Sequence, residues 1–201
     1  MVDEWGTWYP AEPGTNPEFL YQQNSIRDAL AAALTLHIFQ NYCDRVQMAN
    51  IAQTVNVLQA MILTEGEKMV LTPTYHVFDM FQGHQDAIFL PVDVEFETYS
   101  QGDETLPSVS ASASRNDSGE ILLTLCNLRA YDVISLECEL SSFNASSVHG
   151  TMLSADDITA HNTFEQPDRV QPTTFSGAVL EDNRHLKIQL PAASVVALIL
   201  K

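Results

Sequence analysis

The chain has 201 residues, of which 45% are hydrophobic, so it is long enough for one ordinary domain or two small ones with a packed core. Its formal net charge is -17, from 26 acidic and 9 basic residues. So acidic a surface repels the phosphates of nucleic acids and of anionic lipids, which argues against nucleic-acid and membrane partners.

The cysteines Cys43, Cys126 and Cys138 occur without regular spacing. This argues against a disulfide framework. The sequence also has no CxxC or HExxH motif, so no local pattern indicates a zinc site. The opening segment MVDEWGTWYP has neither the basic nor the apolar region of a secretory signal. No apolar run approaches the ~20 residues that span a bilayer. We therefore expect no metal site, and we expect a cytoplasmic protein.

The first predicted element is a helix over residues 25–42. Ser25 can cap its N-terminus, and Asp28 stands three residues later, where a capping box has an acidic or amide residue. Apolar side chains then recur at helical spacing, at Ile26, Leu30, Ala33, Leu34 and Ile38. His37 lies within this apolar pattern, so we expect a core or interface histidine.

Three further features precede the change of pattern near residue 85. Residues 45–51 have strand potential, and the apolar residues 55–63 could form a short helix. Thr72-Pro73 predicts the start of another helix, because proline is favoured at the first helical position. His84 is expected at the surface or packed against a helix. The order helix, strand, helix is typical of an α/β unit.

From about Phe89 the pattern becomes that of strands separated by turns. Apolar and polar residues alternate in residues 134–140 and again in residues 186–190, as in half-buried strands. The apolar runs at residues 121–125 and 195–200 predict two more strands. Several short strands with turns between them are typical of an antiparallel sandwich.

The densest group of functional residue types is the segment Asp3-Glu4-Trp5-Gly6-Thr7-Trp8-Tyr9. Sugars present hydroxyl groups and apolar C–H faces, so carboxylates beside flat aromatic rings suit a carbohydrate site. By composition alone, however, an acidic residue next to tryptophan near a terminus is more often ordinary surface. Composition by itself therefore favours the ordinary surface and keeps the carbohydrate site as the alternative.

A series of short motifs runs through residues 3–80. They are Asp3-Glu4-Trp5 with Trp8-Tyr9, Asn16-Pro17, Tyr21-Gln22-Gln23-Asn24, Arg27-Asp28-Ala29-Leu30, DRVQMANIAQ (residues 44–53), Val55-Asn56-Val57 and LTPTYHVF (residues 71–78). In this order they resemble the family-51 glycoside hydrolases, and together they are highly specific. The later residues resemble that family's C-terminal sandwich in pattern, and the ending LPAASVV (residues 190–196) is also similar.

Members of that family are retaining α-L-arabinofuranosidases with a (β/α)8 barrel followed by a β-sandwich. The resemblance implies that residues 1–84 are the last strands and helices of the barrel and that residues 85–201 are the sandwich. It also implies that Glu4 is the catalytic nucleophile, at the C-terminal end of the seventh barrel strand. The second carboxyl group of the family lies in an Asn-Glu dipeptide, which this sequence lacks. We therefore expect that group and the earlier barrel strands to lie upstream.

The resemblance further implies sugar contacts at Gln53, Trp5 and Trp8. Gln53 would follow the eighth strand at the substrate site, with a loop or helix-capping role as the alternative. Trp5 and Trp8 either line the sugar pocket or pack the rim of the barrel. Asp3 is either a hydrogen-bond partner within the site or a solvent-facing residue.

Two functions follow from these expectations. In the first, the chain is the nucleophile-bearing part of a glycoside hydrolase of L-arabinose metabolism, inactive by itself. That enzyme releases terminal α-L-arabinofuranosyl groups from arabinose-containing oligosaccharides or polysaccharides, a reaction that needs no metal or organic cofactor. In the second, the chain is a non-catalytic sandwich with an accessory or carbohydrate-contacting role. Assembly into a homo-oligomer is expected from the resemblance alone.

Overall fold

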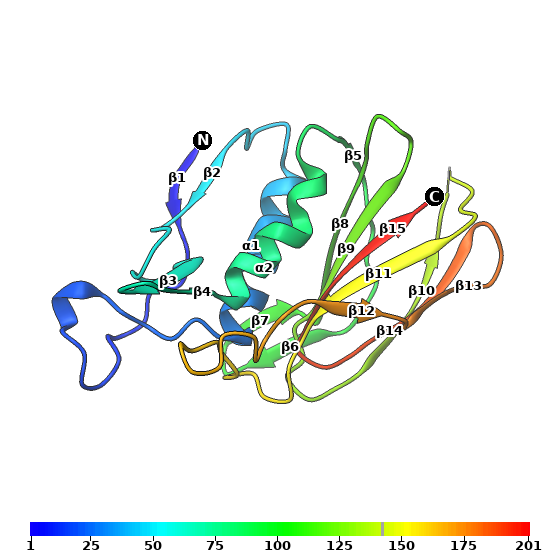
Figure 1. The fold of residues 1–201 in the computed structure, drawn as a ribbon. Helices are drawn as coiled ribbons and strands as arrows, with labels where there is room; N and C mark the ends of the chain where they lie inside the picture. Colours follow the sequence, from blue (N-terminus) through cyan, green and yellow to red (C-terminus); the bar gives the residue numbers. More distant parts are fainter. Residues whose placement is uncertain (142) are drawn as a thin grey trace.

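The computed structural model describes residues 1–141 and 143–201, and β-sheets dominate it (Figure 1). Among these residues the larger sheet has six strands, in the order β12 (Thr173–Phe175), β11 (Val148–Leu153), β15 (Ser194–Leu200), β9 (Ile121–Asn127), β8 (Val109–Arg115) and β5 (Ile88–Leu90). A smaller sheet has the order β10 (Ile134–Glu139), β14 (His185–Leu190) and β13 (Ala178–Leu180). Neighbouring strands are antiparallel in both sheets, so the predicted antiparallel strands are confirmed.

The two sheets enclose the main hydrophobic core. In β14, Leu186, Ile188 and Leu190 are buried while the residues between them are exposed. They pack with Leu123 and Leu198 of the larger sheet in one cluster. The period-two pattern in the sequence therefore marks the inner face of the smaller sheet, as expected for a sandwich.

The other face of the larger sheet is covered by two helices, α1 (Ile26–Asn41) and α2 (Pro73–Phe81) (Figure 1). A second buried cluster joins Ala29 and Val77 of these helices to Cys126 and Val195 of the sheet. All four are at most 1% exposed. The larger sheet is thus buried on both faces, and the described chain has three layers.

Both predicted helices are confirmed, and their starts follow the sequence signals. In α1 the carboxylate of Asp28 accepts a hydrogen bond of 2.8 Å from the backbone N–H of Ser25, as in a capping box. In α2 Pro73 occupies the first turn, and the hydroxyl of Thr72 accepts from the N–H of Tyr75.

Two histidines join the helical layer to the larger sheet. The ring of His37 on α1 lies 2.9 Å from Ser110 Oγ and 3.0 Å from Thr124 Oγ1. The ring of His84, in the 3-10 helix η2 (Gln82–His84), lies 2.7 Å from Ser114 Oγ and 2.9 Å from the same Thr124 Oγ1. His37 is fully buried, as the sequence predicted. Burial lowers the pKa of His37 to about 3 and that of His84 to about 4, so both rings are neutral at pH 7.

The N-terminal part contains a β-α-β-α unit. Strands β1 (Val2–Trp5) and β2 (Ala49–Ile51) pair in parallel, α1 connects them, and α2 follows. Of the segment predicted over residues 45–51, only its end forms a strand. Parallel strands joined by a helix have their carboxyl ends on the same edge, so the loops that leave β1 and β2 emerge side by side.

The short helix considered for residues 55–63 is wrong. Asn56 and Leu58 have positive φ angles of 61° and 53°, which a helix does not tolerate. The N–H of Leu58 donates to the carbonyl of Leu20 at 3.0 Å, and that of Asn56 to the carbonyl of Ile62. Leu58, Ala60 and Leu63 are buried, whereas Val55 is 42% exposed. A run of apolar residues therefore does not by itself distinguish such a loop from a buried helix.

Two hairpins complete the described structure. One joins β3 (Ile62–Glu65) to β4 (Lys68–Leu71), and the other joins β6 (Thr98–Gln101) to β7 (Glu104–Pro107). A further 3-10 helix, η1 (Pro17–Phe19), lies in the loop that follows β1. Within the described ranges, every helix is too short or too polar to span a membrane.

Candidate active site

Asp3 and Glu4 lie side by side in β1, and both are exposed. The pairing of β1 with β2 slips by one residue between Val2 and Trp5. Irregularities of this kind redirect side chains and are over-represented beside active sites. The two carboxylates therefore lie in an irregular stretch near the carboxyl end of a strand, a usual place for catalytic groups in α/β proteins.

Trp5, the next residue, packs on the helices. Its ring is edge-on to Phe39 of α1 at 5.5 Å between centroids and stacked on Phe78 of α2 at 6.0 Å. Its Nε1 is buried and has no hydrogen-bond partner within residues 1–141 and 143–201. These are contacts of the packing role expected for Trp5, and its role in sugar contact stays a prediction.

Gln53 and Trp8 are both exposed in the described structure. Gln53 is exposed directly beyond β2 and adopts a left-handed backbone with φ of 65°. Its neighbour Ala52 donates its N–H to the carbonyl of Trp5 at 2.6 Å, so the loop with Gln53 runs against the end of β1. The side chain of Trp8 is 66% exposed in the loop after β1. The structure thus brings the two loops with these residues to the same edge as Glu4.

Three buried polar side chains that were not predicted as site residues hold the loop after β1. The N–H of Thr7 donates to Gln59 Oε1 at 2.9 Å, and its hydroxyl donates to Asp28 Oδ1 at 2.9 Å. Gln22 donates from Nε2 to Thr7 Oγ1 at 3.2 Å and accepts from the N–H of Tyr9. In the sequence, Gln59 stands out as a polar residue within the apolar run Val57–Ala60. The sequence does not show, however, that its partner is Thr7.

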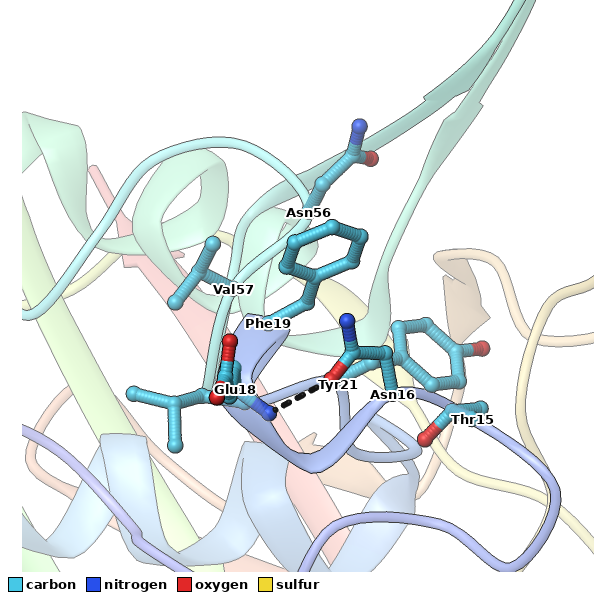
Figure 2. Close-up of a pocket in the computed structure, with 8 residues that line it drawn as sticks. Thr15, Asn16, Glu18, Phe19, Tyr21, Asn56 and Val57 are labelled. Carbon is cyan, nitrogen blue, oxygen red and sulfur yellow. Dashed lines mark hydrogen bonds between the residues drawn. The ribbon is translucent and has the colours of Figure 1, made fainter.

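An open pocket of about 550 Å³ lies between the loops that leave β1 and β2 (Figure 2). Phe19, 69% exposed, projects into it between Tyr21 and Asn56, and the N–H of Glu18 donates to Asn16 Oδ1 at 3.0 Å. The backbone bond from Leu58 to Leu20 ties the two loops together. These loops therefore form one continuous surface at the carboxyl ends of both strands.

At this edge, Glu4 can supply a carboxylate that acts as nucleophile or base. Gln53 can supply an amide and Trp8 an aromatic ring to contact a polar ligand. Hydrolysis with retention also needs a second carboxyl group about 5–5.5 Å from the first. Over the described residues, no group of three or more His, Cys, Asp and Glu side chains could hold a metal ion.

The family model described as the alpha-L-arabinofuranosidase C-terminal domain matches residues 3–194. The chain belongs to this family. The match begins at Asp3 within β1, includes both helices and ends at Ser194, the first residue of β15.

Relatives named as arabinofuranosidases match most of the chain. The chain is 47% identical over 199 residues to an intracellular exo-alpha-L-arabinofuranosidase from Bacteroides ovatus, a match over 98% of this chain and 38% of that protein. It is 26% identical to an intracellular exo-alpha-(1->5)-L-arabinofuranosidase from Streptomyces lividans, over 90% of this chain and 29% of that protein. The chain therefore spans well under half the length of the relatives it matches.

Solved arabinofuranosidase structures share the fold. The GH51 arabinofuranosidase from Xanthomonas axonopodis pv. citri matches with a TM-score of 0.96 and 48% identity, over 100% of this chain and 40% of that chain. The arabinose complex of the Thermotoga maritima α-L-arabinofuranosidase matches with a TM-score of 0.83 at 24% identity, over 98% of this chain and 42% of that chain. At 24% identity, the match to the Thermotoga maritima enzyme shows a shared fold alone.

Proposed function

We propose that the chain is the nucleophile-bearing part of a retaining α-L-arabinofuranosidase and that Glu4 is the nucleophile. The observation that carries this proposal is the exposed position of Glu4 near the end of β1, beside the loop that bears Gln53. Membership of the arabinofuranosidase family and the names of relatives at 47% and 48% identity support the activity.

We further propose that β1 and β2 are the seventh and eighth strands of a (β/α)8 barrel, so that residues 1–84 belong to the barrel. In the described residues β1 and β2 pair only with each other and form a two-stranded sheet. Two strands leave two sheet edges unpaired, and closing a barrel satisfies both. The upstream strands of the complete enzyme would pair there and bring the second carboxyl group to the site.

In the proposed reaction, the Glu4 carboxylate attacks the anomeric carbon of a terminal arabinofuranosyl group. The bond to the leaving oxygen breaks as the second carboxyl group donates a proton to that oxygen. The same group then takes a proton from water, which attacks the glycosyl-enzyme and frees Glu4. Two displacements retain the configuration, and no metal or organic cofactor takes part.

The proposed substrates are arabinose-containing oligosaccharides or polysaccharides, in L-arabinose metabolism. Gln53 would hydrogen-bond the sugar, and Trp8 would offer a flat face to it. A cytoplasmic location is proposed because the relatives from Bacteroides ovatus and Streptomyces lividans are named intracellular. Homo-oligomer formation stays a prediction from the resemblance.

The chain by itself is expected not to hydrolyse 4-nitrophenyl α-L-arabinofuranoside, because one carboxylate on an open two-stranded sheet lacks its acid/base partner. Joined to the upstream part of the Bacteroides ovatus relative, it is expected to become active, and Glu4→Gln should remove that activity. Assays of 4-nitrophenol release by the purified chain and by the fusion test both expectations. Turnover by the chain alone that Glu4→Gln abolishes would contradict the need for the upstream part. A fusion that folds and stays inactive would favour the non-catalytic sandwich.

We propose the domain boundary at residues 84 and 85, between η2 and β5, although the two parts share a buried cluster. Residues 85–201 alone would expose Cys126 and Val195 on the helix-facing side of the larger sheet. We expect this fragment to unfold at lower urea than the whole chain and to self-associate, since exposed apolar patches promote association. Val195→Thr in the fragment should reduce the association, which sedimentation would measure. A fragment that stays monomeric and unfolds at the same urea concentration as the whole chain would contradict this.

A further inference from the structure

The loop that follows β1 is held at Thr7, and every polar atom of that residue is used. Its N–H donates to Gln59 Oε1 and its hydroxyl to Asp28 Oδ1, both at 2.9 Å. Gln22 Nε2 donates to the carbonyl of Thr7 at 3.3 Å and to its hydroxyl at 3.2 Å. Gln22 and Asp28 come from the start of α1 and the residues just before it, Gln59 comes from the segment after β2, and each is at most 2% exposed. Buried polar groups that are fully paired specify one local conformation.

The anchors are themselves tied to the starts of both helices. The second oxygen of Asp28 accepts from the N–H of Ser25 at 2.8 Å and from its hydroxyl at 3.0 Å, at the N-terminus of α1. Gln59 Nε2 donates to the carbonyl of Asp28 at 2.7 Å and lies 3.3 Å from Thr74 Oγ1, in the first turn of α2. The loop is thus fixed to the N-terminal ends of both helices.

The backbone also passes close to this network. Gly6, with φ of 149°, separates Trp5 from Thr7, and a Cβ at this position would lie 3.3 Å from Gln59 Oε1. Trp5 is fixed on the other side by Phe39 and Phe78. Glu4 therefore stands one residue before a packed tryptophan and three residues before a fully bonded threonine.

We propose that Thr7, Asp28 and Gln59 are positioning residues that orient Glu4 for attack and hold Trp8 at the sugar site. This proposal rests on the assignment of Glu4 as the nucleophile. The residues would act through the backbone of the loop and would not touch the sugar. An error of about 1 Å in the position of a reacting group can lower the rate about 100-fold, so loss of the Thr7 anchor is expected to appear mainly in kcat.

The test compares Thr7→Val, which keeps the shape and loses the hydroxyl, with Thr7→Ser, which keeps the hydroxyl. In the fusion with upstream barrel strands, Thr7→Val is expected to lower kcat by about 10- to 100-fold and to change KM by less than about threefold. Thr7→Ser should stay within about threefold of the parent kcat. Thr35→Val is the matched control, because the Thr35 hydroxyl donates to the carbonyl of Ala31 within α1 rather than to the loop.

A second readout needs no catalysis. Hydrogen exchange on the chain as it stands should be about tenfold faster at residues 6–9 in Thr7→Val and unchanged in the middle of α1. Faster exchange with an unchanged kcat in the fusion would overturn the positioning role and leave the assignment of Glu4 intact. An equal loss of kcat in Thr7→Ser and Thr7→Val would also overturn it. Activity that survives Glu4→Gln would instead refute the proposed nucleophile, whatever the exchange shows.

Discussion

Glu4→Ala in the enzyme with restored upstream strands is expected to lower turnover of 4-nitrophenyl α-L-arabinofuranoside by about four to six orders of magnitude. The reason is that no other side chain would form the glycosyl-enzyme. Azide should partly restore the rate, because the smaller alanine leaves room for an external anion where the carboxylate stood. The product should be the arabinofuranosyl azide of inverted configuration, since only one displacement occurs. Proton NMR of the anomeric centre would identify it.

Asp3→Ala is the matched control, because Asp3 is the neighbouring exposed carboxylate in the same strand. We expect a milder loss, without rescue by azide, since Asp3 would not bond to the sugar. If Asp3→Ala lost all activity and azide restored it, while Glu4→Ala kept most of the rate, the nucleophile would be Asp3. The experiment therefore distinguishes two carboxylates that both lie in the irregular stretch of β1.

The free energy of unfolding is expected to fall steeply as the pH drops below about 6.5, the pKa of an unperturbed histidine. The folded pKa of His37 is lowered to about 3 and that of His84 to about 4. Between these values and about 6.5 the unfolded chain binds protons that the folded chain does not, so stability is lost as the pH falls. Each histidine contributes up to about 1.4 kcal/mol per pH unit in this window. Urea unfolding at pH 7, 6 and 5 measures the slope.

The variant His37→Gln isolates this contribution. Glutamine does not titrate and can still hydrogen-bond Ser110 or Thr124. The number of protons that the chain takes up on unfolding between pH 7 and pH 5 should therefore decrease by up to about one. Equal slopes for the parent and His37→Gln would show that His37 is not held neutral in the folded chain.

Local signals in the sequence predicted the regular elements well. The capping pair Ser25 and Asp28 located the start of α1, and Pro73 located the start of α2. These signals are reliable because a helix terminus is satisfied by residues within one turn. The alternation in residues 186–190 likewise marked β14, because neighbouring side chains in a strand point to opposite faces. By contrast, the apolar residues 55–63 did not predict their loop, since the N–H of Leu58 bonds the carbonyl of Leu20 in another loop.

The sequence by itself determined the family, the two helices, the antiparallel strands and the candidate nucleophile Glu4. It could not assign Asp28 and Gln59 to the loop that follows Glu4. One oxygen of Asp28 caps its own helix, but the other binds Thr7, 21 residues away, and Gln59 binds the same residue across 52 residues. Only the tertiary structure decided these contacts, because a buried polar side chain must find a partner and the sequence does not record which one folding brings within reach.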